Sequence, residues 1–136
     1  MAGIKTHEDL IAWQLSEELK DRVFAFTARS GVARHRDFCD DIRRSARSAP
    51  ANLSEGFYRF RPRENATFVR YALGSLGESK NHLRHALKEN YVTQQEFDEM
   101  WRFAKRAIGA ATRLHKYLKS CPPDGPKSNP NPKREP

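Results

Sequence analysis

The segment Thr93–Ser120, TQQEFDEMWRFAKRAIGAATRLHKYLKS, has the pattern of one long amphipathic helix. It opens with a capping box, in which the side chains of Thr93 and Glu96 satisfy backbone amides at a helix start. Apolar residues then recur every three or four positions and predict one buried side. The residues of this side are Phe97, Trp101, Ala104, Ile108, Ala111 and Leu118. A helix of this length with one apolar side is typical of a helical bundle.

Three further segments have helical periodicity, and none alternates with the two-residue period of a strand. They run from about Thr6 to Arg29, from Arg34 to Phe57 and from Pro62 to Asn90, and Pro50 should kink the second. Long helices joined by short loops become antiparallel neighbours. We therefore predict an all-α fold, an antiparallel up-down-up-down four-helix bundle over residues 1–120. Residues 121–136 are proline-rich and polar, and we expect them to form a disordered tail.

The composition favours a single basic domain. The 136 residues carry a net charge of +8 and give a pI of about 9.8, which favours nucleic acid or acidic protein surfaces as partners. The alternative is a merely soluble basic protein. No apolar segment approaches the ~20 residues that span a bilayer, and no secretory signal is evident, so we expect a cytoplasmic protein without membrane contact. Cys39 and Cys121 are too few for a disulfide framework.

Two groups of basic residues are candidate nucleic-acid contacts. Five cations of the last predicted helix share a sector about 100° wide. They are Arg102, Lys105, Arg106, Arg113 and Lys116. The second group, Arg59, Arg61 and Arg63, adjoins aromatic residues at 57, 58 and 60, a mixture in which rings stack unpaired bases and arginines hold the backbone. Either group could be an ordinary solvated surface. The nearby Arg43, Arg44 and Glu55 are more typical of a structural ion-pair network.

Signals for metal binding and catalysis are weak. Glu78, His82, His85 and Glu89 share one face of the third predicted helix, but di-metal bundles draw their ligands from several helices. We predict no metal and no cofactor. The sequence has no nucleophile elbow and no glycine-rich phosphate loop, so we expect that the protein is not an enzyme. Glycines 74 and 77 lie in a helical pattern, where we expect them to allow close helix packing.

The first predicted helix has two apolar sides. One is formed by Ile11, Leu15, Leu19, Val23 and Phe26. The second, nearly opposite, consists of Leu10, Trp13 and Phe24. Because a bundle buries one stripe per helix, the second should contact another subunit, with Trp13 as its anchor. The alternative is that this stripe packs beneath the loop around residues 57–60.

Three stretches of the chain are similar to one known family. They are HEDLIAWQ at residues 7–14, DIRRSA at 41–46 followed by ANLSEG at 51–56, and ALGSLGE at 72–78. In this order they resemble the 23S rRNA intervening-sequence proteins, whose broad fold is shared with accessory proteins of diversity-generating retroelements. The resemblance covers about residues 6–120 and implies a four-helix bundle and a homopentameric ring, but no established activity. The chain departs from the family pattern at Pro50 and in its tail.

These observations predict a non-enzymatic, homo-oligomeric bundle that binds nucleic acid, either structured RNA or RNA/DNA, through its basic faces. The alternative is a scaffold that docks a partner protein such as a reverse transcriptase, which the resemblance to retroelement accessory proteins implies. Salt should separate the two, because contacts with phosphates weaken steeply as ionic strength rises.

Overall fold

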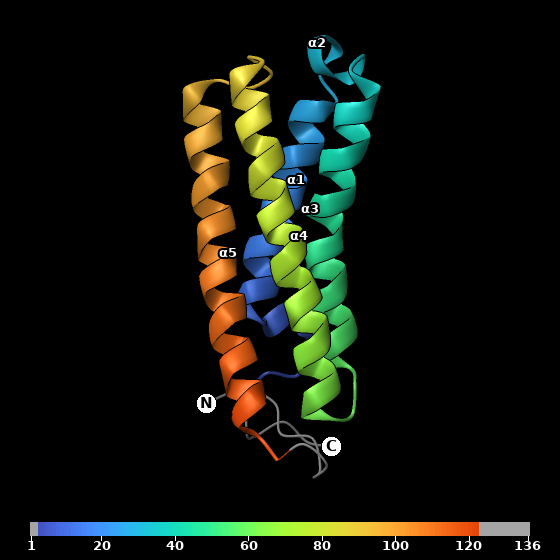
Figure 1. Cartoon of the computed structure of the whole chain (residues 1–136), viewed down its shortest axis with the longest axis vertical. Coiled ribbons are helices and arrows are strands. Elements are labelled where there is room, and N and C mark those ends of the chain that lie inside the picture. Colours follow the sequence, from blue (N-terminus) through green and yellow to red (C-terminus); the bar gives the residue numbers. More distant parts are fainter. Residues whose placement is uncertain (1–2, 123–136) are drawn as a thin grey trace.

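Four long helices, each packed against two neighbours, make up the part of the chain that this computed structural model describes, residues 3–122. They are α1 (Ile11–Thr27), α3 (Arg36–Phe57), α4 (Pro62–Lys88) and α5 (Gln94–Ser120). Helices α1 and α4 each pack against α3 and α5, and the four run up, down, up and down (Figure 1). The predicted all-α antiparallel bundle is confirmed. The predicted disordered tail lies, from residue 123 on, outside the described residues.

Two short elements complete the described chain. A 3-10 turn, η1 (His7–Asp9), precedes α1, and a single helical turn, α2 (Ser30–Ala33), joins α1 to α3. Neither was predicted. No helix in the range 3–122 is both long and apolar enough to cross a membrane.

Local signals define the connection between α4 and α5. Asn90 has a φ of 61°, and its amide donates to Leu87 O at 3.1 Å while the amide of Tyr91 donates to Ala86 O at 2.8 Å. This is a Schellman motif, which ends a helix by satisfying its last carbonyls. The predicted capping box then starts α5, because Thr93 Oγ1 accepts from the amide of Glu96 at 3.1 Å and Glu96 Oε1 accepts from the amide of Thr93 at 2.9 Å.

The start of α1 differs from its prediction. Asp9 Oδ2 accepts from the amides of Lys5 (2.8 Å) and Thr6 (3.1 Å), but this cap holds only the 3-10 turn. Leu10 is extended, with φ −76° and ψ 126°, so its side chain enters the core and is only 4% exposed. Ile11, predicted to be buried, is 56% exposed. The reason is that Ala12 and Ser16 occupy the positions that face the core, and Ile11 lies about 100° away from Ala12.

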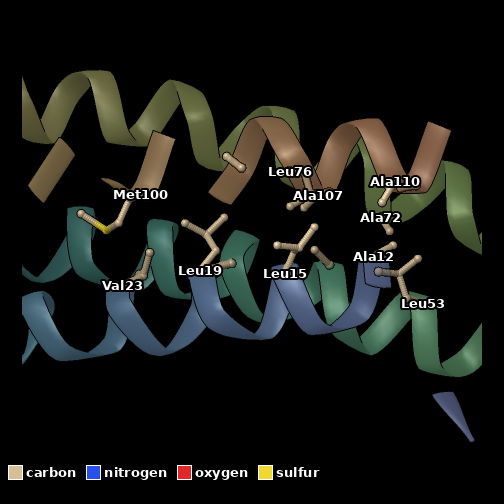
Figure 2. Packing of buried hydrophobic residues seen from close by; sticks show 14 of the residues in the cluster. Ala12, Leu15, Leu19, Val23, Leu53, Ala72, Leu76, Met100, Ala107 and Ala110 are labelled. Atoms are coloured by element: carbon tan, nitrogen blue, oxygen red, sulfur yellow. The ribbon is translucent and has the colours of Figure 1, made fainter. Parts of the chain in front are cut away.

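The side of α5 that faces the core is built mainly from alanines. They are Ala104, Ala107, Ala110 and Ala111, with Met100, Leu114 and Leu118 toward the ends. Leu15 and Leu19 of α1 and Leu76 of α4 fill the space opposite (Figure 2). The predicted residues Phe97, Trp101 and Ile108 lie at one edge of this side and are half-buried. Small residues allow α5 to approach its neighbours closely. Its charged side chains lie on the outer side.

Helices α3 and α4 are joined by two pairs of hydroxyl groups, one buried and one half-buried. Ser45 Oγ lies 2.9 Å from Ser79 Oγ, and Ser75 Oγ donates to Ser48 Oγ at 2.8 Å. Because these groups are paired across the interface, they specify one register of the two helices. Helix α3 continues through Pro50, which is buried, and does not end there.

The glycines of the bundle have different roles from those predicted. A Cβ at Gly56 would lie 2.7 Å from Asn65 Oδ1 and 2.8 Å from Phe68 Cβ, so α3 and α4 approach closely there. A Cβ at Gly74 or Gly77 would meet nothing within 4 Å. The expectation that these two glycines allow helix packing is therefore wrong within the single chain.

Gly56→Ala should lower the free energy of unfolding by about 1–3 kcal/mol, because the added methyl group overpacks the α3–α4 contact. Urea denaturation monitored by circular dichroism measures the change. Gly77→Ala is the matched control, also within a helix, and should raise stability by about 0.5–1 kcal/mol. Stabilisation by both substitutions would contradict the close approach at Gly56.

Candidate nucleic-acid interface

The last 21 residues of α5 carry six cations and no carboxylate. They are Arg102, Lys105, Arg106, Arg113, Lys116 and Lys119, and all six are exposed. The structure thus brings the five predicted cations of this helix together on its outer side, opposite the alanines. None of these five has an ion pair with another residue in the range 3–122.

Helix α4 adds two cations that the sequence analysis missed. Lys80 Nζ lies 4.4 Å from the centroid of the Trp101 ring, and Arg84 Cζ lies 4.6 Å from it. Phe97 stacks on Trp101, with ring centroids 5.2 Å apart. The cation–π contacts hold both charges beside α5, and neither cation has a carboxylate partner among the described residues. The available signal was the spacing of four residues between Lys80 and Arg84, a like-charge pair that repels on one helix face.

A third contact between α4 and α5 lies nearer the other end of the helices. His115 of α5 is half-buried, and its pKa is lowered first by burial and then by the charges of Lys119 and Arg70. The charge of Arg70 of α4 therefore contributes to the electrostatic environment of this α5 histidine. Helices α4 and α5 run side by side (Figure 1). We call the shared surface the α4–α5 basic face: the six cations of α5 with Arg70, Lys80 and Arg84.

Charge is unevenly distributed among the four long helices. Helix α5 has six Lys and Arg against three Asp and Glu, and α4 has five against two. Helix α3 has four of each sign, and α1 has two basic against three acidic residues. The positive charge of the bundle is therefore concentrated in the half that carries the α4–α5 basic face.

The second predicted group is divided by the structure. Arg59 is held within the chain, because its Nη2 donates to Glu55 Oε2 at 2.6 Å and its guanidinium lies 4.8 Å from the Phe68 ring centroid. Arg61 and Arg63 are exposed, and Arg63 lines a cleft of about 100 Å³ together with Lys119. Arg63 thus extends toward the end of the α4–α5 basic face, whereas Arg59 stabilises the α3–α4 turn.

The residues predicted to form a structural network do so with different partners. Arg44 Nη2 lies 3.3 Å from Asp41 Oδ1 and 4.0 Å from Glu78 Oε2, and it links α3 to α4. Arg43 Nε instead donates to Thr27 Oγ1 at 2.8 Å. Arg44 and Glu55 thus form ion pairs, as interpreted from the sequence, whereas Arg43 contacts the neutral Thr27 and the Phe24 ring and has no ion pair within the described residues.

The stripe predicted as a subunit interface is partly covered by the chain itself. Leu10 is buried and is a wrong prediction for an interface, because its extended backbone turns it into the core. Trp13 packs edge-on against His7, with ring centroids 5.0 Å apart, and Phe24 lies 4.6 Å beneath the Arg43 guanidinium. His7 Nδ1 is 3.1 Å from the Tyr58 hydroxyl, so the predicted covering loop contributes at one end. Self-association through Trp13 and Phe24 stays a prediction.

The acidic and histidine side chains of α4 do not form a metal centre within the described residues. Glu78 Oε2 lies 3.6 Å from His82 Nε2. No group of three or more His, Cys, Asp or Glu residues between positions 3 and 122 is placed to hold an ion. Burial raises the pKa of the Cys39 thiol, which favours its neutral form.

The fold and this surface define a class of protein, the basic four-helix bundle whose positive charge gathers on one face. The model of the family described as 23S rRNA-intervening sequence protein matches residues 8–120, and the chain belongs to this family. Among solved structures, the chain is similar to a protein of unknown function from the S23 ribosomal protein family of Bacteroides thetaiotaomicron VPI-5482. The identity is 16% and the TM-score 0.71, covering 78% of this chain and 99% of that one, so the likeness shows the fold. No curated protein matches the chain.

The pKa shift of His115 predicts a pH-dependent stability. Since its pKa is below the ordinary 6.5 in the folded protein, the unfolded chain binds more protons as the pH falls through about 6.5. The free energy of unfolding should therefore fall between pH 7.5 and 5.5, and His115→Gln should reduce this fall. Urea denaturation at the two pH values measures it. An unchanged fall in stability in the His115→Gln variant would contradict the assignment.

Proposed function

We propose that this protein is a non-enzymatic bundle that binds nucleic acid, either structured RNA or RNA/DNA, through the α4–α5 basic face. The observation that carries the proposal is the run of six exposed cations without a carboxylate along α5. Like charges gathered on one surface repel one another, and the phosphates of a polyanion neutralise them. The binding also releases counterions condensed on the polyanion, which contributes affinity. The near balance of charge on α1 and α3 leaves this face as the favoured contact.

The dimensions of the face suit a phosphate backbone. With a rise of ~1.5 Å per residue, the helix from Arg102 to Lys116 spans about 21 Å. A nucleic-acid duplex presents one phosphate charge per ~1.7 Å of its axis, so several cations can contact phosphates at once. Lysines and arginines that contact phosphates position the ligand and contribute affinity without reading its sequence.

Self-association is the second part of the proposal. We propose a homo-oligomer, a pentamer by resemblance, that acts in the cytoplasm. Exposed Ile11 supports an interface on α1, because it borders an apolar groove of about 350 Å³ with Ile4 and Tyr117. Light scattering after size exclusion should give a mass near five subunits for the wild type. Ile11→Asp should reduce it while helicity is kept, and a wild-type monomer would overturn this part.

The double substitution Arg102→Glu, Lys105→Glu should weaken nucleic-acid binding at least tenfold at low salt. Removing two phosphate contacts should also reduce the salt slope of log K by about 1.4–1.8. Fluorescence anisotropy with a labelled RNA hairpin at several salt concentrations measures both quantities.

The matched control is Arg36→Glu, Arg47→Glu, which makes the same change of net charge on exposed positions of α3. If the α4–α5 basic face binds the ligand, this control should lose much less affinity. Equal losses would show that only net charge matters and would contradict the assigned face. The alternative, a scaffold that docks a partner protein such as a reverse transcriptase, predicts no salt-sensitive RNA binding by the isolated protein.

A further inference from the structure

The exposed aromatic side chains of the described chain gather around the α3–α4 turn. Four large hydrophobic residues in the range 3–122 are exposed, and three of them are the aromatics Tyr58, Phe60 and Tyr71. Phe60, in the turn itself, is 67% exposed, and Tyr71, in the third turn of α4, is 51% exposed. An exposed apolar ring is unfavourable in water, so rings gathered in one place indicate a binding surface.

The turn is anchored on both sides of Phe60. Before it, Phe57 is fully buried, and Arg59 is fixed between Glu55 and the Phe68 ring. After it, Pro62 is buried at the first position of α4. Phe68 in turn contacts Tyr71 edge-on, with ring centroids 5.8 Å apart. Phe60 is therefore exposed although the residues on both sides of it are packed, and Tyr71 is exposed beside the packed Phe68.

Positive charge connects this turn to the α4–α5 basic face. Arg63 is exposed three residues after Phe60, and it lines the small cleft that also contains Lys119 of α5. Arg70 immediately precedes Tyr71, so the two lie about 100° apart around α4, and Tyr71 contacts Phe68, which adjoins Gly56 of α3. A strand whose phosphates lie on the α4–α5 basic face therefore crosses the outer side of α4, past Arg63, to reach Phe60 and Tyr71.

We propose that Phe60 and Tyr71 stack on unpaired bases of a nucleic-acid strand, while Arg63 contacts its phosphates. The inference rests on the proposed function and names the ligand class within it, a single-stranded segment. Base faces are available to aromatic rings only where the bases are unstacked, so a fully paired duplex does not use this site. An apolar protein partner fits less well, because arginines interrupt the aromatic surface.

The test compares two probes with the double variant Phe60→Ala, Tyr71→Ala. One probe is a 12-nucleotide oligouridine, and the other is a blunt RNA duplex of 12 base pairs. Stacking on an aromatic ring changes affinity by about fivefold to 150-fold per base. The variant should bind oligouridine at least tenfold more weakly and the duplex within about twofold of the wild type. Gln95→Ala, at an exposed position near the start of α5 and outside the assigned surfaces, should change neither.

A second variant gives a direct signal. Phe60→Trp should keep oligouridine affinity, and its fluorescence should be quenched by oligouridine beyond the quenching of the wild type, but not by the duplex. The same measurements with oligodeoxyuridine distinguish an RNA strand from a DNA strand as the preferred ligand.

The outcomes separate the inference from the proposed function. Wild-type affinity of the double variant for oligouridine, with duplex binding intact, would overturn the inference alone. Failure of the wild-type protein to bind either probe at low salt would overturn both. Equal losses on the two probes would also overturn the inference, because they would show no preference for unpaired bases at this turn.

Discussion

The paired serines between α3 and α4 fix the register on which both candidate surfaces depend. Ser45 and Ser79 are buried and bond to each other, and Ser48 and Ser75 repeat the contact one turn away. Because Ser75 and Ser79 are four residues apart, a shift of α4 by one turn would keep one serine pair and break the other, so the observed register is the one that makes both contacts. One register therefore determines where the turn ends and which residues of α4 meet α5.

The two edges of α5 show why its α4 side is suited to anions. On both edges a cation from a neighbouring helix covers an aromatic ring of α5, Arg22 over Phe103 and Lys80 with Arg84 over Trp101. Arg22 also pairs with Glu18 and Glu99, so its charge is compensated within the fold. Lys80 and Arg84 contact the Trp101 ring and have no carboxylate partner among the described residues. The two edges therefore share this packing, but the cation over the ring is paired with carboxylates at the α1 edge and not, among the described residues, at the α4 edge.

Sequence alone predicted the features that depend on local signals. The capping box at Thr93 and the proline at position 62 gave helix starts that the structure confirms, because caps act within one turn. Burial was predicted less well where it depends on a neighbouring helix. Leu10 is buried and Ile11 is exposed, the reverse of the prediction. The helix begins only after the extended Leu10, so the helical spacing does not apply to that residue. Lys80 and Arg84 were missed because their place beside Trp101 follows from the packing of α4 on α5, which no spacing within a single helix encodes.

The exposed glycines of α4 lie where the proposed contact with phosphates is made. Glycine inside a helix costs about 0.5–1 kcal/mol relative to alanine, and no contact within the described chain compensates for it at Gly77. Arg70, Gly77 and Arg84 are spaced by seven residues, so they follow one line along the outer side of α4. In the proposed function, the missing side chain at Gly77 leaves the helix backbone between Arg70 and Arg84 accessible to a phosphate. The local loss of helix stability at Gly77 is then a departure from local propensity of the kind that occurs at functional sites.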